Sequence, residues 1–137
     1  MRTVLDTGVV VAGIFWTAEP QQCLVALARR RYTLVLSEDI FQEYQSIASR
    51  LKKRYALPRN PQPWLDWLRS CGRFVESPPL PQPVCRDPKD DKFLACALAA
   101  GASYVVARDL DLLVLEKPFG IGMVTPRKFL SLLAEKG

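Results

Sequence analysis

The sequence predicts an α/β fold, a sandwich in which helices cover a mostly parallel central sheet. Short apolar runs recur along the chain without the apolar–polar alternation of a half-exposed strand. Segments with helical periodicity separate these runs, as right-handed strand–helix–strand crossovers require. The chain has 137 residues, 49% hydrophobic and 24% charged, which suffices for one core and predicts a single domain over residues 1–137.

The strands are expected where the apolar runs fall, at 3–5, 33–36, 103–107 and 121–124, with a short one near Phe74 and Val75. The opening apolar stretch, 4–16, carries Asp6 in its middle and is too short to span a bilayer. We therefore interpret it as a buried strand and its continuation, in a protein without a membrane segment.

The helices are expected at about 20–30, 38–54, 61–71, 88–100 and 126–135, with a short helix at 110–115. The first of them ends in three arginines, which suit the negative end of a helix dipole. Eight of the eleven prolines fall between Pro58 and Pro88. With one core in the chain, they predict stiff connections around a helix and a short strand, not a linker between domains.

The composition excludes several kinds of active site. The chain contains no histidine, so a Ser-His-Asp or Cys-His triad and a Cys/His zinc site are impossible within it. The formal net charge is +5, which favours a polyanionic partner such as nucleic acid. Four cysteines without a CxxC pair are typical of free thiols in a reducing cytoplasm.

Acidic residues follow two of the predicted strands. Asp6 comes directly after the first strand, and Asp109 and Asp111 follow the strand at 103–107. Ligands of open α/β sheets bind outside the carboxyl ends of the strands, so we expect these carboxylates to point at a site. Each of them alone is also explained as a turn or helix cap.

Further acids are predicted on two flanking helices. Glu43 lies on or beside the apolar stripe of its helix, where a carboxylate needs a partner, water or a cation; a solvated flank is the alternative. Asp87 reads as a helix N-cap. Asp90 shares the inward face of Phe93, whereas Asp91 is rotated away, so Asp90 is the better ligand candidate, with a capping-box role as its alternative.

Converging carboxylates in a chain without histidine suit cations that prefer oxygen ligands, Mg²⁺ or Mn²⁺. With a basic surface around such a cluster, the simplest chemistry is metal-assisted hydrolysis of phosphodiesters. The patterns of a haloacid-dehalogenase phosphatase, a receiver domain and a GxGxxG dinucleotide enzyme do not appear.

Four motifs, taken with their order and spacing, resemble the PIN domain family over essentially the whole chain, and most closely its small prokaryotic members that serve as toxins of toxin–antitoxin pairs. They are Val4-Leu5-Asp6-Thr7, Glu43 within 37–44, 86–97 and 107–113. This resemblance implies a Rossmann-like sheet of about five parallel strands and a metal-dependent endoribonuclease in the role of a toxin.

Carried over residue by residue, the resemblance places the catalytic and metal-binding acids at Asp6, Glu43, Asp90 and Asp109, with Asp111 as a substitute for the last. In the resulting hypothesis Asp6, Asp90 and Asp109 hold one Mg²⁺ or Mn²⁺. Glu43, with Asp6 or Asp90, orients a second ion or the attacking water.

Supporting residues depart from the family pattern at two positions. The family usually has Asn where this chain has Gly8, and Ser or Thr where it has Ala107. Loss of such orienting groups weakens metal affinity by roughly ten- to a hundredfold. Thr7 remains as partial compensation, and Asp87 and Asp91 are further neighbours of the proposed ligands.

The predicted partners are RNA, an antitoxin protein and a second copy of the chain. Candidate phosphate contacts are Arg29, Arg30, Arg31, Lys52, Lys53 and Arg54, and the competing interpretation of each run is a solvated helix end. Homodimerisation could use Trp64, Trp67, Phe41 and Tyr44, for which core packing is the competing use. The rival hypotheses are a non-catalytic PIN-like module that binds RNA or protein and, less favoured, a DNA nuclease on the same site.

Overall fold

The computed structural model describes residues 1–136 as an α/β sandwich around a five-stranded sheet. The strands are β1 (Arg2–Leu5), β2 (Thr33–Leu36), β3 (Arg73–Phe74), β4 (Tyr104–Val106) and β5 (Gly122–Val124). The α-helices are α1 (Thr7–Phe15), α2 (Glu19–Ala28), α3 (Glu38–Tyr55), α4 (Gln62–Cys71), α5 (Asp91–Ala100), α6 (Leu110–Leu113) and α7 (Pro126–Lys136). Two 3₁₀ turns are η1 (Pro88–Asp90) and η2 (Pro118–Gly120).

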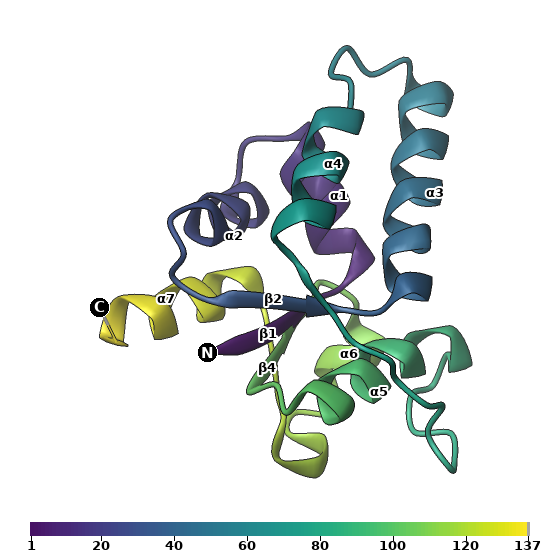
Figure 1. Cartoon of the computed structure of the whole chain (residues 1–137), viewed down its shortest axis with the longest axis vertical. Coiled ribbons are helices and arrows are strands. Elements are labelled where there is room, and N and C mark those ends of the chain that lie inside the picture. The colour runs from purple at the N-terminus through teal and green to yellow at the C-terminus, as the bar shows by residue number, and fades with distance from the viewer. Residues whose placement is uncertain (137) are drawn as a thin grey trace.

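All strand pairs are parallel, in the order β3-β2-β1-β4-β5, which confirms the predicted fold class. Central β1 pairs with both neighbours, so that Thr3 lies opposite Leu34 on one side and Tyr104 on the other. Figure 1 shows α1 and α2 on one side of the central strands and α5 and α6 on the other. Continuous apolar runs suit these strands because both faces of the sheet are covered.

The carboxyl ends of β1 and β4 meet at one edge of the sheet. The Asp6 amide after β1 donates to the Val106 carbonyl at the end of β4, at 2.9 Å. Helix α3 starts two residues after β2 and runs from this edge away from the sheet (Figure 1). The topology therefore brings the turns after β1, β2 and β4 to one place.

Three element predictions were wrong in detail. The continuation of the first strand is a helix, α1, whose residues Val9 to Ile14 are all buried; a helix buried all round has no periodicity to distinguish it from a strand. The helix predicted at 88–100 is divided into η1 and α5. The helix predicted at about 20–30 ends at Ala28, because Arg30 has a left-handed φ of 58°.

The aromatic side chains divide between core and surface. Phe41 and Tyr44 are fully buried, so core packing accounts for both, whereas Trp64 and Trp67 are half-buried on α4. All four cysteines are free thiols. In the part of the chain that the structure describes, no single helix is long and apolar enough to cross a membrane; α1 and α2 reach that length only together, across a 92° bend.

Candidate active site

Asp6 is a buried carboxylate at the junction of β1 and α1. Its Oδ1 accepts the Val9 amide at 2.8 Å as the N-cap of α1, and its Oδ2 accepts the Arg108 amide at 3.2 Å. Burial raises the pKa of Asp6 to about 6; the amides of Val9, Arg108 and Asp109 oppose this shift without cancelling it. A carboxylate held in this way is expensive to ionise unless a cation lies beside it.

The structure gathers Asp90, Asp109 and Asp111, whose carboxylate oxygens lie within 4.8 Å of one another. Asp109 caps α6 by accepting the Asp111 amide at 2.9 Å, and Asp90 joins η1 to α5. Burial, and then the charge of Asp109, raise the pKa of Asp90 to about 7. Within residues 1–136, the buried Oδ2 of Asp90 has no hydrogen-bond partner.

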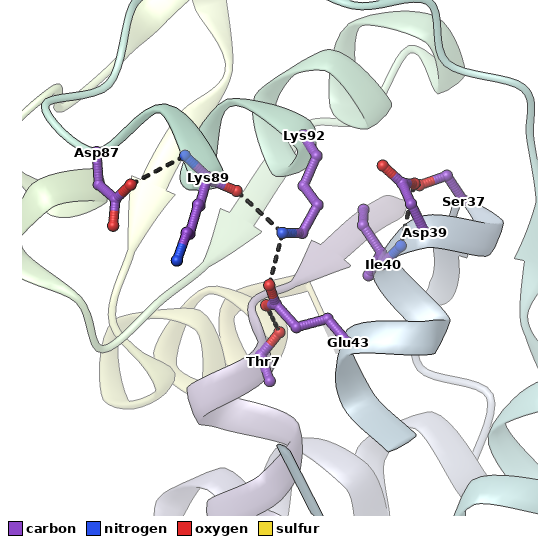
Figure 2. A network of polar contacts seen from close by, with 8 residues as sticks. All are labelled: Thr7, Ser37, Asp39, Ile40, Glu43, Asp87, Lys89 and Lys92. Atoms are coloured by element: carbon purple, nitrogen blue, oxygen red, sulfur yellow. Dashed lines mark hydrogen bonds and ion pairs between the residues drawn. The ribbon is translucent and has the colours of Figure 1, made fainter. Parts of the chain in front are cut away.

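Glu43 reaches the same region from α3 but is held by protein donors. Its Oε1 accepts the Lys92 ammonium at 2.5 Å, and its Oε2 accepts the Thr7 hydroxyl (Figure 2). Across the described residues, the carboxylates gathered within 4.8 Å do not include Glu43 or Asp6. The sequence predicts Glu43 and Thr7 as site residues, but it gives no indication that Lys92 would pair with the glutamate.

The neighbouring acids have structural partners. Asp87 caps η1 by accepting the Lys89 amide at 3.0 Å. Asp91 turns away from the cluster, as predicted, and its Oδ1 accepts the amides of Val84 at 3.3 Å and Cys85 at 2.8 Å. Asp111 is 3.5 Å from the exposed Arg86 guanidinium, a pair that the sequence analysis missed.

The two basic runs lie away from the carboxylates. Residues 29–31 lead into the amino end of β2, at the opposite edge of the sheet, and Arg31 donates to the Leu133 carbonyl at 2.8 Å. Lys52 is nine residues beyond Glu43 on α3, roughly 14 Å along the axis. The structure does not bring either run to the site.

Basic side chains that the sequence analysis missed lie closer. A groove of about 610 Å³ is lined by Trp16, Glu19, Arg108, Thr125 and Arg127 among others. Arg108 is the residue whose amide binds Asp6, so the groove adjoins the site. The position of Arg108 directly before Asp109 was the available signal.

The donor set fits a divalent metal. In the described part of the chain, the cluster of Asp90, Asp109 and Asp111 offers carboxylate oxygens alone. Mg²⁺ and Mn²⁺ prefer oxygen ligands. Asp90 contributes a buried oxygen without a protein partner, an arrangement that a cation would satisfy. Gly8 and Ala107 add no polar side chain, so the orienting groups usual at these positions are absent.

Comparison with known proteins decides the family. A family model of the PIN domain matches residues 2–111. The chain belongs to the PIN domain family. The PIN domains are generally nucleases and usually use divalent metals, which agrees with the acidic group at the sheet edge.

A solved structure supports the same fold for this PIN domain. The crystal structure of PAE2754 from Pyrobaculum aerophilum aligns with a TM-score of 0.61 at 20% identity, over 98% of this chain and 99% of that one. A search of curated proteins found no significant match.

Proposed function

We propose that this PIN domain is a metal-dependent endoribonuclease that hydrolyses phosphodiester bonds of RNA. The observation that carries the proposal is the convergence of Asp90, Asp109 and Asp111, with a buried oxygen on Asp90 that has no partner among residues 1–136. The charge of Asp109 also acts on the buried carboxylate of Asp6. Self-repelling carboxylates of this kind are costly without a cation, so their arrangement is best explained by metal binding.

The acidic residues have different roles in this proposal. Asp6, Asp90 and Asp109 would hold one Mg²⁺ or Mn²⁺, with Asp111 beside Asp109 as a further or substitute ligand. A divalent ion bound there supplies the Lewis acidity that activates water and stabilises charge on the phosphate. Glu43, fixed by Thr7 and Lys92, would orient the attacking water or a second ion.

RNA would approach along the groove that Arg108 lines, next to the residue that follows it, Asp109. Arg108 and Arg127 offer guanidinium groups to phosphates, and the half-exposed Trp16 offers a ring on which a base can stack. Arg127 lies 4.0 Å from Glu19 in the same groove, an exposed ion pair that a phosphate would have to replace. The runs at 29–31 and 52–54 remain candidates for contacts with the outer parts of a longer RNA. The net charge of +5 supports this assignment of substrate.

We extend the proposal to a role as the toxin of a toxin–antitoxin pair acting in the cytoplasm. An apolar pocket of about 390 Å³ between α2 and α4 is lined by Leu24, Trp64 and Trp67 among others, and offers a surface to an antitoxin protein or a second copy of the chain. We expect a homodimer, which analytical ultracentrifugation of the purified chain would detect.

The test is cleavage of labelled single-stranded RNA at low salt with Mn²⁺ or Mg²⁺. Wild type should cleave, and both EDTA and Asp6→Asn should abolish cleavage. Asp66→Asn removes the same charge from the exposed face of α4 and should cleave like wild type. Equal cleavage by Asp6→Asn would refute the assigned site, and RNA binding without cleavage by metal-saturated wild type would favour the non-catalytic module.

A further inference from the structure

Lys92 occupies a position that its helix does not favour. It lies in the first turn of α5, where the helix dipole favours acids and disfavours cations. Its side chain is only 21% exposed, and its ammonium contacts the Glu43 carboxylate at 2.5 Å and the Lys89 carbonyl at 3.0 Å, with the Phe93 ring centroid 5.4 Å away. The pairing with Glu43, not a local helix preference, therefore accounts for the placement (Figure 2).

Glu43 and Asp90, on the two sides of the acidic site, consequently differ in whether their oxygens have partners. Glu43 has both oxygens engaged, one by Lys92 and the other by Thr7. Asp90, by contrast, keeps a buried oxygen that has no partner among residues 1–136. On the Glu43 side a largely buried ammonium already sits against the carboxylate. On the other side the nearby cation is the exposed Arg86, which pairs with Asp111 and leaves the buried oxygen of Asp90 without a partner among residues 1–136.

We propose that Lys92 is a positioning residue that keeps Glu43 from ligating metal and so limits the site to one divalent ion. Two-metal sites place their ions about 3.5–4 Å apart between shared carboxylates. A second ion on Glu43 would have to displace the Lys92 ammonium from the same oxygen. While Lys92 stays in place, Glu43 holds no ion, and its role is to orient water. This inference rests on the proposed function, because it requires the first ion at the Asp90 group.

The experiment counts Mn²⁺ ions on the folded, EDTA-stripped protein by equilibrium dialysis, with calorimetry for affinity. Wild type should bind one ion per chain. Lys92→Met keeps the length of the side chain and removes its charge, so it should bind two, whereas Lys92→Arg should bind one. The double variant Lys92→Met/Glu43→Gln should return to one ion, because the second ion depends on Glu43.

Lys89→Met is the matched control, since it removes a charge one turn away and leaves the Lys89 carbonyl in place. It should bind one ion; two ions in both lysine variants would overturn the inference in favour of a general charge effect.

Circular dichroism shows whether each variant folds. If Lys92→Met does not fold, Glu43→Gln decides: one ion with a Kd within about threefold of wild type supports the inference, and loss of the ion overturns it.

The outcomes separate this inference from the proposed function. Two ions on wild type, or one ion on both wild type and folded Lys92→Met, would overturn the role of Lys92 and leave the nuclease proposal standing. Absence of any Mn²⁺ binding by wild type would overturn both.

Discussion

Asp6 shows how a single residue couples the fold to the site. It caps α1 and is 4% exposed, so its charge costs folding free energy while its oxygens order two backbone amides. Since burial raises its pKa from 3.8 to about 6, the folded state without metal binds a proton more tightly than the unfolded state. The stabilisation that comes from this tighter proton binding is fully present below about pH 4 and is lost as the pH rises through 6.

The stability of Asp6→Asn relative to wild type should therefore rise by about 1–3 kcal/mol between pH 4 and pH 8 in EDTA, because the variant carries no buried charge. Its side chain keeps an oxygen for the Val9 amide but turns an NH₂ group towards the Arg108 amide, a cost that does not depend on pH. Urea unfolding at both pH values measures the rise, with Asp66→Asn as a control that removes an exposed carboxylate. A stability difference that does not change with pH would contradict the assigned cause.

Gly8 offers a test of the missing orienting group. A Cβ built at Gly8 meets only the Asp6 Oδ1, at 3.6 Å, which is ordinary contact distance. Gly8→Asn should therefore fold, and its amide should donate to a carboxylate of the site and tighten Mn²⁺ binding by up to roughly tenfold. Calorimetric titration measures the affinity. Gly8→Ala, which adds the Cβ without the donor, should leave affinity near wild type; an equal gain would attribute the effect to helix propensity.

At the scale of elements, the sequence predicted those that have helical periodicity or form a short apolar run. The amphipathic helix α3 and the buried strands were predicted close to their observed bounds. Asp90 was preferred over Asp91 because of its helical face and because of the spacing that the family resemblance implies before Phe93. Helix α1 was missed because it is buried all round. The break after η1 was missed because Asp87 and Pro88 are equally good at starting a 3₁₀ turn or an α-helix.

Asp91 anchors the proline-rich segment to α5. Its carboxylate accepts the amides of Val84 and Cys85, so Asp91→Ala leaves two donors without their partner and should destabilise the protein by about 1–3 kcal/mol. Chemical denaturation and hydrogen exchange at these two amides measure the effect. Asp87→Ala, which removes an exposed cap, should cost under about 1 kcal/mol; equal losses, or unchanged exchange, would contradict the anchoring role.

At the scale of the whole molecule, topology explains why the site could be predicted and its surroundings could not. The rule that carboxyl ends of parallel strands share an edge is sufficient to bring Asp6 and Asp109 together from their sequence positions. Groups that complete the site, such as the Lys92 ammonium and the Arg108 backbone amide, depend on how α3, α5 and the sheet pack. No local pattern encodes those distances, and so the sequence placed phosphate contacts in its most conspicuous basic runs.

The groove and the distant basic run make opposite predictions for RNA binding. If phosphates follow the groove, Arg108→Ala together with Arg127→Ala should weaken binding of single-stranded RNA by at least about tenfold and lower the salt slope by roughly 0.7 per lost contact. Lys53→Ala, at the far end of α3, removes one charge and should change affinity less than about twofold. Fluorescence anisotropy in EDTA, across a salt series, measures both without cleavage. A larger loss of affinity and of salt slope for Lys53→Ala than for the arginine pair would show that the RNA follows α3 and not the groove. The salt slope counts the phosphate contacts themselves, so it distinguishes the two paths wherever the acids lie.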